Sequence, residues 1–370
     1  MLSERSPFHL LMERATPVAE TSVDKGQAAR GIEMRGTLSW VWTLLGPFLG
    51  LVLIIALFGT ITRSSGTFLT ADNWRTIAVQ TVIVGTAALG MTIIMIAGGI
   101  DLSAGSTVAL VTVGIAMFVK KVDPQLSDSI RDLKLVLPLA LLLGIAIGGL
   151  CGMINGALIA GLRVVPFIVT LGSYTVYRGF ATWLASSTTV YVPGDVKPWW
   201  FTQIMKIEPE PRWLLVAPAV WVLLGLSILV AFALHYSLLG RYVYAIGSNE
   251  ATARLCGINV PFIKVIVYSL GGLAMGLAGV LQFAYLGAIG DPTTAGGLEL
   301  QVIAAVVIGG GSLSGGEGTV MGTLIGCLIM QVLKNGCVHA GIPNPSQDII
   351  IGIIIVAAVT LDRLRRTKVS

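Results

Sequence analysis

The sequence predicts an all-α integral membrane protein of about ten transmembrane helices with glycine-rich breaks. Two features of composition favour this class, because 55% of the 370 residues are hydrophobic and only 12% are charged. Soluble domains are about one quarter charged, and so few charges could not cover the surface of a water-soluble protein of this size. The third feature is a series of long apolar runs, since a helix needs about 20 residues to cross about 30 Å of hydrocarbon.

Ten apolar runs are expected to be membrane spans, and several are short enough to require tilt, re-entrance or a shifted boundary. In chain order, the predicted spans are Leu38–Ile61, Ile77–Ala97, Ala104–Val119, Leu135–Ile159, Pro166–Ala185, Leu214–Leu234, Phe262–Leu286, Leu298–Ile308, Thr319–Val332 and Ile349–Leu361. They fall in a transmembrane domain of residues 38–362. A polar tail (1–37) precedes this domain, and a basic tail (363–370) follows it.

Ten spans place both termini on one side of the membrane. The basic tail, RLRRTKVS, assigns that side to the cytoplasm, where lysine and arginine next to spans are retained. The loop at about residues 236–261 then faces the cytoplasm, and residues 186–212 face the outside. The net charge of +5 does not indicate nucleic-acid binding, because the basic residues form no long run or aromatic-interleaved patch.

Residues 312–318 read SLSGGEG, and LSGGE within them is one letter from LSGGQ, a signature of ABC-type ATPases. ATP hydrolysis also needs a phosphate-binding loop that ends in Gly-Lys. No lysine in this sequence directly follows a glycine. The string therefore does not predict an ATPase, and the chain is expected to bind no cofactor. The sequence contains neither a CxxC nor an HExxH motif, so no metal site is predicted.

A better match to this string lies inside the chain. GGIDLSAGSTV (98–108) resembles GGGSLSGGEGTV (309–320) if one insertion is allowed, and each lies between two apolar runs. The match is either a chance likeness of glycine-rich turns or a duplicated helix break, as transporters build from internal repeats. The predicted break or gate residues are Gly98, Gly99, Asp101, Ser103, Gly309, Gly310, Ser314 and Gly316.

Asp101 is the only charged residue between Thr76 and Val119. An ionisable side chain in such an apolar region predicts a functional role. The alternative is a helix cap, in which Asp101, Ser103 and Ser314 accept hydrogen bonds from the free N–H groups of the following helices.

The predicted cytoplasmic loop contains SLLGRYVYAIGSNEATARLCGINV (237–260). Ser248 or Asn249 is expected to cap a short helix with Glu250 in its first turn, and Gly257 to end it in a left-handed conformation. Such a helix between two spans can be a simple surface connector or a site of contact.

Four motifs in order carry a family resemblance, namely GGIDLSAGS, VPFIVTLGSYTVYRGFA, GRYVYAIGSNEATARLCGI and AAVVIGGGSLSGGEGTVMGTLIG. From about Trp74 to the C-terminus, they resemble the membrane permease subunit of bacterial ABC importers in the ribose/xylose/arabinose/galactose class. The resemblance implies a multi-pass inner-membrane subunit that is not an enzyme and forms the path for a pentose or hexose. The implied partners are a separate cytoplasmic ATPase carrying ATP and Mg²⁺, a periplasmic sugar-binding protein, a second permease subunit and the lipid bilayer.

The resemblance makes the cytoplasmic loop a coupling segment that contacts the ATPase through Gly247, Asn249, Glu250, Arg254 and Gly257. Gln301 stands where relatives commonly carry Asp, and Glu317 stands where a basic residue is common, which leaves the substrate open. Separately from the resemblance, planar polar groups and aromatic faces recognise neutral sugars. On that ground the possible substrate path comprises Tyr174, Gln282, Tyr285, Thr293 and Glu299, although each can be a satisfied interface group.

Two other functions stay open. Branched-chain amino acid and nucleoside importers share a related architecture. An ion-coupled secondary transporter would need intramembrane coupling groups, and the candidates, mostly at span ends, are Asp101, Arg178, Asp291, Glu299 and Glu317. A membrane enzyme is disfavoured, because the sequence offers no nucleophile–base pair or metal cluster.

Overall fold

A computed structural model describes residues 46–63, 66–122, 136–192, 198–210 and 214–367. For residues 358, 359 and 361–367 it describes the main chain only. The chain divides into two units, Met1–Leu45 and Gly46–Ser370, and all of the described residues belong to the second. The predicted polar tail, the first eight residues of the first predicted span and the side chains of the basic tail lie outside this description.

The described chain is mostly helical, and each predicted span overlaps a helix over the residues that the structure describes. After the helix Gly46–Ile61, the helices are α2 (Ala71–Ile96), α3 (Ala104–Val122), α5 (Val136–Leu162), α6 (Pro166–Leu184), α7 (Trp199–Ile204), α8 (Pro218–Tyr236), α9 (Leu238–Ser248), α10 (Glu250–Leu255), α11 (Val260–Tyr285), α12 (Leu298–Ile308), α13 (Val320–His339) and α14 (Asn344–Thr367). Among the described residues, six helices are long and apolar enough to cross a membrane: α2, α3, α5, α8, α11 and α13. The prediction of a helical membrane protein is confirmed at this level, and the count of about ten crossings stays a prediction.

Several helix ends follow from local sequence. Thr70 caps α2 by accepting a hydrogen bond from the Asn73 amide, and Thr319 caps α13 in the same way. Proline occupies the first turn of α6, α8 and α11, where its missing N–H costs no helical hydrogen bond. These signals fix where helices begin, whereas their length follows from the apolar runs.

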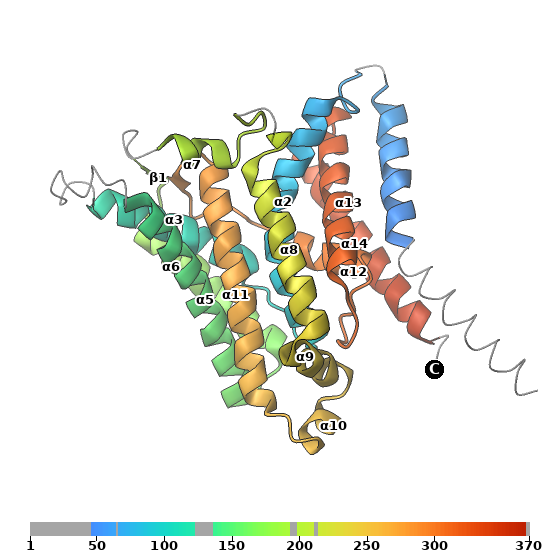
Figure 1. Ribbon diagram of the computed structural model, residues 1–370. Coiled ribbons are helices and arrows are strands. Elements are labelled where there is room, and N and C mark those ends of the chain that lie inside the picture. The colour runs from blue at the N-terminus through green and yellow to red at the C-terminus, as the bar shows by residue number, and fades with distance from the viewer. Residues whose placement is uncertain (1–45, 64–65, 123–135, 193–197, 211–213, 368–370) are drawn as a thin grey trace, which may run out of the picture. The chain divides into compact units, whose positions relative to one another are not determined.

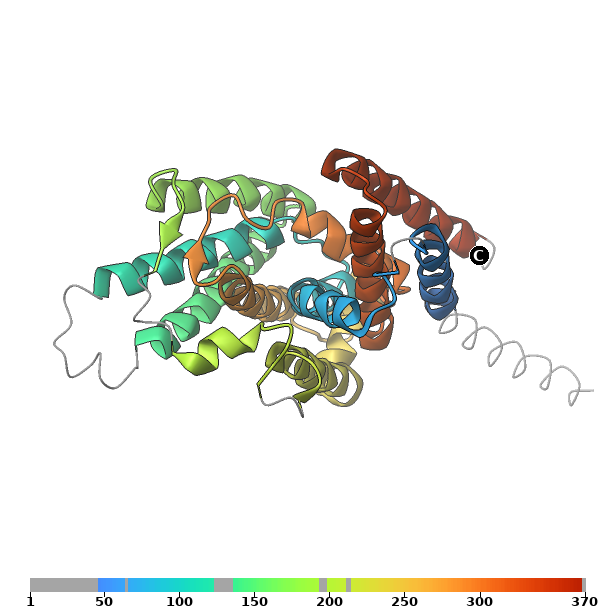
Figure 2. The ribbon, with the colours of Figure 1, turned by 90° about the horizontal axis from the view of Figure 1, so that it is seen from above.

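Helix α11 packs between α5 and α3 on one side and α2 on the other, as the view in Figure 2 shows. The contact with α5 is formed by glycines spaced four residues apart. A Cβ atom at Gly148 or Gly152 of α5 would collide with the main chain of α11, and one at Gly272 would collide with that of α5. The expectation that small residues let helix backbones approach closely in this chain is confirmed here.

The two ends of this unit carry different elements (Figure 1). At one end, the two-residue strands β1 (Val190–Tyr191) and β2 (Ile289–Gly290) pair antiparallel, with Val190 opposite Gly290, and α7 lies close by. At the other end lie α9 and α10. The segments that follow α6 and α11 are therefore joined by backbone pairing at the end opposite the predicted coupling segment.

The structure corrects several boundaries. Helix α2 begins six residues before the predicted span, α13 extends seven residues beyond it, and α14 begins five residues earlier and continues to Thr367. The predicted coupling loop contains two helices instead of one. Ser237 starts the additional helix, α9, by accepting a hydrogen bond from the Gly240 amide at 3.0 Å.

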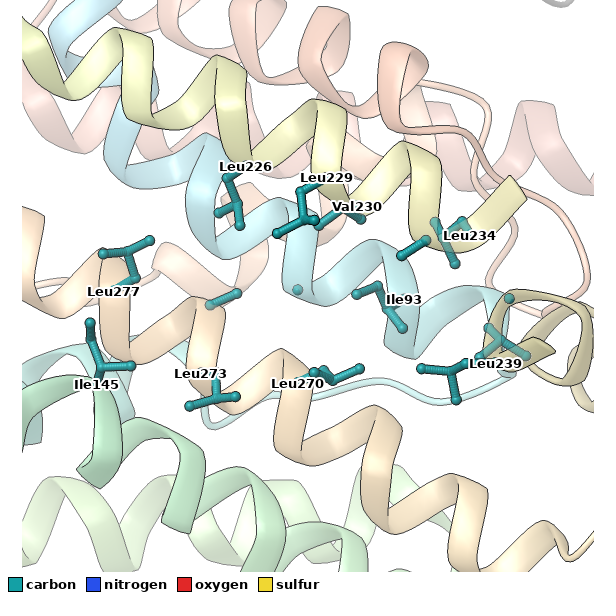
Figure 3. Close-up of a pocket in the computed structure, with 15 residues that line it drawn as sticks. Ile93, Ile145, Leu226, Leu229, Val230, Leu234, Leu239, Leu270, Leu273 and Leu277 are labelled. Atoms are coloured by element: carbon teal, nitrogen blue, oxygen red, sulfur yellow. The ribbon is translucent and has the colours of Figure 1, made fainter. Parts of the chain in front are cut away.

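An apolar cavity of about 330 Å³ lies between α8 and α11, with residues of α2, α5 and α9 completing its wall (Figure 3). Leu226, Leu229 and Leu234 of α8 face Leu270 and Leu273 of α11 across it. Every lining residue is apolar. Sugar hydroxyls would lose their hydrogen bonds with water there and gain none, so this cavity does not fit a sugar.

Candidate functional site

The first glycine-rich break separates α2 from α3. Gly98 has φ 78°, a left-handed conformation that glycine adopts at little cost, and Gly99 leaves no room for a Cβ atom beside the Tyr268 hydroxyl. The Tyr268 hydroxyl donates to the Ile100 carbonyl at 3.4 Å, and Thr170 donates to the same carbonyl at 3.2 Å. The interrupted main chain is therefore held by side chains from α6 and α11.

Asp101 begins a buried polar network that joins the first break to two helices, α5 and α6. Its Oδ1 accepts from the Ser103 amide at 2.8 Å and from the Ser103 hydroxyl at 2.6 Å. The side-chain amide of Asn155 in α5 donates to that hydroxyl at 2.9 Å, and the Tyr177 hydroxyl of α6 donates to the side-chain oxygen Oδ1 of Asn155 at 3.1 Å. Asp101 Oδ2 is buried and has no hydrogen-bond partner among the residues that the structure describes. Asp101 thus orders the break itself, and one carboxylate oxygen is left unused.

The second break, between α12 and α13, contains a different cap from the predicted one. Gly310 and Gly316 have φ 90° and 76°, as a glycine-rich turn requires. A Cβ atom at Gly309 would collide with the Gly322 carbonyl. Thr319, and not Ser314, caps α13, because five residues (315–319) separate Ser314 from the start of the helix. Ser314 instead donates its amide to the Ser312 hydroxyl at 3.1 Å.

The two breaks meet each other, and both meet the end of α9. The Gly316 amide donates to the Ile96 carbonyl at 2.8 Å, which joins the second break to the last residue of α2. Gly247 of α9 packs so closely against this pair that a Cβ atom at position 247 would collide with the Ile96 carbonyl. Tyr244, also on α9, donates to the Gly318 carbonyl at 2.8 Å. The matching motifs and the predicted coupling segment therefore form one junction, hereafter the Gly247 junction.

Helix α10 is a short, capped helix on the far side of α9. Asn249, one of the two predicted caps, accepts from the Thr252 amide at 2.9 Å. Gly257 ends the helix with φ 82°, and the Ile258 amide reaches back to the Ala253 carbonyl at 3.1 Å. Leu255 is 88% exposed. An exposed leucine on a capped, protruding helix is suited to packing against another protein.

Glu250 connects α10 to the first turns of α11. Its carboxylate pairs with Arg254 at 2.5 Å and with Lys264 at 2.8 Å. Partial burial raises the pKa of Glu250, but hydrogen bonds from Lys264 and Arg254 outweigh that effect and hold the pKa below its ordinary value. Glu250 is therefore charged at neutral pH and holds α10 at a fixed angle to α11.

A polar cavity of about 250 Å³ lies among α2, α11, α12 and α13. Gln282 and Tyr285, two of the predicted path residues, line it. The other polar residues in its wall are Gln80, Gln301, Gln331 and Lys334. Primary amides offer both donors and acceptors without charge, so this wall can exchange hydrogen bonds with hydroxyl groups.

The other three predicted path residues surround the loop between β2 and α12. Arg178 donates to the Pro292 and Thr294 carbonyls at 2.7 and 2.8 Å, and its guanidinium lies 5.8 Å from the Tyr174 ring centre. Thr293 donates to Asp291 at 2.7 Å, and Glu299 is buried in the first turn of α12. Gln282 ties this loop to the cavity by donating to Thr294 at 2.8 Å. Tyr174, Thr293 and Glu299 do not line the cavity; they lie around the loop that forms part of its wall.

Residue reasoning missed Asn155 and Tyr177 in the Asp101 network, and Gln80, Gln331 and Lys334 in the cavity. A signal was present for four of them, because Asn155, Tyr177, Gln80 and Gln331 are polar side chains inside predicted apolar runs, whereas Lys334 follows the end of one. Asn155, for example, is the only amide side chain in α5. A polar residue within a span is costly unless it has a partner, so each of these positions predicts a buried contact.

Comparison with known proteins identifies the family. Residues 73–359 match the family described as branched-chain amino acid transport system / permease component. The chain belongs to this family. The permease is 40% identical to the ribose import permease protein RbsC of Bacillus subtilis over 322 residues, which cover 86% of this chain and 92% of that protein.

Two further relatives cover a similar share of the permease. It is 33% identical over 326 residues to the D-allose transport system permease protein AlsC of Escherichia coli, covering 87% of this chain and 92% of that protein. It is also 33% identical over 326 residues to the fructose import permease protein FrcC of Rhizobium meliloti, covering 86% of this chain and 84% of that protein. No solved structure matches the chain. Family membership and the candidate spans make the permease a multi-pass inner-membrane transport subunit.

Proposed function

We propose that the permease is the transmembrane subunit of an ABC importer and forms the path for a pentose or hexose. The names of its relatives carry this proposal, because RbsC, AlsC and FrcC are permeases for ribose, allose and fructose and align over most of both chains. The family description refers to branched-chain amino acids. The relatives are more informative about the solute than the family description, since each of them aligns with this chain over most of its length.

The polar cavity supports a sugar as the solute. Its wall combines Gln80, Gln282, Gln301 and Gln331 with the ring of Tyr285. A sugar presents hydroxyl groups in several directions and apolar ring faces, which uncharged amides and an aromatic ring can contact together. A branched-chain amino acid would instead place an apolar side chain against these amides and leave some of them without partners.

The free energy for import comes from a separate ATPase that binds ATP and Mg²⁺, because the sequence of the permease has no Gly-Lys phosphate-binding loop. We place the ATPase contact at α10 and its caps, with Gly247, Asn249, Glu250, Arg254 and Gly257 as the coupling residues. The exposed Leu255 supplies an apolar contact, and the ion pairs of Glu250 keep α10 rigid enough to transmit force.

The Gly247 junction provides a physical route from the ATPase to the pathway. A displacement of α10 moves α9, and α9 contacts both breaks through Gly247 and Tyr244. Both breaks can then shift together, which is the movement that alternating access through internal repeats requires. Gly98, Gly99, Asp101, Ser103, Gly309, Gly310, Ser314 and Gly316 act as this gate in the proposal.

The assembly includes a periplasmic sugar-binding protein and a second permease subunit. About ten crossings place α10 and both termini in the cytoplasm, and β1, β2 and α7 on the outside. The strand pair and α7 are then the surface available to the binding protein, with Tyr191 and Trp199 as exposed aromatic residues.

Uptake into proteoliposomes tests the proposal. The permease is reconstituted with a candidate ABC ATPase and a candidate sugar-binding protein from the same organism, and labelled ribose, allose, fructose and leucine are supplied in turn. We expect ATP-dependent accumulation of at least one sugar and none of leucine. Leucine accumulation without any sugar uptake would identify an amino acid importer instead.

A second arm of this experiment tests the alternative that the chain is an ion-coupled secondary transporter. Vesicles that contain the permease without its ATPase are given an ion gradient, with and without an uncoupler. Sugar uptake that needs no ATPase and collapses with the uncoupler would overturn the proposal and assign the buried carboxylates of Asp101 and Glu299 to ion coupling.

A further inference from the structure

A third cavity, of about 260 Å³, lies where the end of α5 and the start of α6 approach α10 and α11. Three cationic side chains line it, those of Arg163, Arg254 and Lys264, and Glu250 is the one acidic residue in the wall. The remaining lining residues are apolar. The described wall therefore carries a net charge of +2 in a small space.

Most of the hydrogen-bonding capacity of these cations is unused. Glu250 occupies one guanidinium nitrogen of Arg254 and one donor of Lys264. A guanidinium has five N–H donors and an ammonium has three. Among the described residues, no hydrogen bond or ion pair involves Arg163. The three side chains thus present a set of donors that suits a second anion beside the Glu250 carboxylate.

The rim of the cavity is apolar and exposed. Leu162 and Val165, on either side of Arg163, are 64% and 61% exposed, and Phe262, which follows Pro261 of the wall, is 61% exposed. In a membrane protein, such side chains face acyl chains. The cavity therefore lies at a boundary, with a cationic interior on one side and a lipid-facing helix surface on the other.

We propose that this cavity binds the phosphate headgroup of an anionic phospholipid, with its acyl chains along Leu162, Val165 and Phe262. Basic pockets between transmembrane helices at the membrane surface are typical sites for such headgroups. Arg163 is the main contact, and Arg254 and Lys264 provide further donors from the coupling segment. The inference does not depend on which solute crosses the membrane or on which side α10 lies, since phosphate headgroups cover both faces of a bilayer.

Titration of the purified full-length permease with phosphatidylglycerol tests the site, with native mass spectrometry measuring the dissociation constant of the first bound lipid. Arg163→Gln is expected to weaken this binding about fivefold, the effect of one cation near a membrane surface, and Arg163→Lys to retain most of it. Arg241→Gln is the matched control, because Arg241 is an exposed arginine of the neighbouring α9 that does not line the cavity. Equal weakening by both glutamine variants, or by neither, overturns the proposal.

Two further arms distinguish other occupants. In the first arm, inorganic phosphate is added at millimolar concentration, and a short-chain phosphatidylglycerol is compared with the long-chain lipid. If phosphate displaces the lipid from the wild type but not from Arg163→Gln, and both lipids bind with the same affinity, the site is one for a soluble anion and the lipid assignment is wrong. If Arg163→Gln leaves lipid affinity unchanged and instead lowers the amount of copurifying ATPase, the cavity is a protein contact. Both glutamine variants are first compared with the wild type by size-exclusion chromatography, and if Arg163→Gln misfolds, Lys264→Gln, which removes another cation of the same wall, takes its place in the titration.

Discussion

Gly247 packs directly against the carbonyl oxygen of Ile96, and a Cβ atom at position 247 does not fit between them. The same carbonyl accepts the hydrogen bond from Gly316. One residue of the coupling segment thus contacts the end of α2 and the second glycine-rich break together, although the three segments are far apart in the sequence.

Gly247→Ala should therefore separate α9 from both breaks. We expect ATP-driven uptake to fall at least about fivefold, since overpacking of a close contact costs about 1–3 kcal/mol. Gly225→Ala in α8 is the control, because a Cβ atom there meets no atom within 4 Å. Uptake in proteoliposomes at equal amounts of inserted protein measures the effect, and normal uptake by Gly247→Ala would show that the junction tolerates movement without loss of coupling.

Glu250→Gln should loosen α10 at neutral pH. The variant loses both ion pairs, and after allowance for solvent screening we expect a loss of about 0.5 kcal/mol in the local stability of α10. Hydrogen exchange of the α10 amides measures this loss. Glu210→Gln is a matched control, since Glu210 forms a comparable i,i+4 pair with Lys206 in a different loop.

The same pair predicts a pH dependence. Because the pKa of Glu250 is lowered in the folded state, its stabilising effect is present above the ordinary glutamate pKa and is lost as the pH falls through the lowered value. The difference in exchange between wild type and Glu250→Gln should be constant near neutral pH, begin to shrink as the pH falls below the ordinary glutamate pKa, and disappear only below the lowered pKa. A difference that persists in acid would mean that the charge of Glu250 is not what holds α10.

Two substitutions of Asp101 show whether its side chain orders the first break through hydrogen bonds or acts through its charge. Asp101→Asn keeps a side-chain oxygen that can accept from Ser103, whereas Asp101→Leu leaves the Ser103 donors unsatisfied at a cost of about 1–3 kcal/mol. We expect Asn to retain folded protein and uptake, and Leu to lower the yield of folded protein. Uptake per folded molecule is the measurement. A folded but inactive Asn variant would assign function to the carboxylate charge.

Gln331 tests the polar cavity. Its side chain is 3% exposed and lines the cavity, so Gln331→Met removes an amide without opening a void. If sugar passes here, the half-saturating concentration should rise or the maximal uptake should fall by about five- to tenfold, the value of one hydrogen bond to a solute. Gln203→Met is the control, because Gln203 is a similarly buried glutamine of α7 outside the cavity.

Local features of the fold were predictable, and contacts between distant segments were not. Consecutive glycines located both breaks, and Asn249 and Gly257 located α10, because caps and left-handed turns depend on neighbouring residues. The short helix α9 was missed, although Ser237 before Leu238 is a start signal of the same kind. The early start of α2 was missed in the same way, because Thr70 caps it in a polar stretch before the apolar run.

The candidate site was predicted less completely. Gln282 and Tyr285 line the polar cavity. Tyr174 does not line it and lies beside Arg178, which binds the loop after β2. Nothing in the sequence states which polar residues of separate helices share a cavity. The hydrogen bond from Gly316 to Ile96 joins the second motif to the end of α2, directly before the first motif. The sequence could not predict this contact, because the two segments lie about 200 residues apart.

The glycine contact between α5 and α11 limits how the permease can change shape. Where Gly148 and Gly152 lie against Gly272, two main chains touch with no layer of side chains between them. Side chains can switch rotamers to accommodate sliding, but touching backbones cannot. Helices α5 and α11 consequently travel as one rigid pair, and the flexing of a transport cycle falls on the segments that connect this pair to its neighbours.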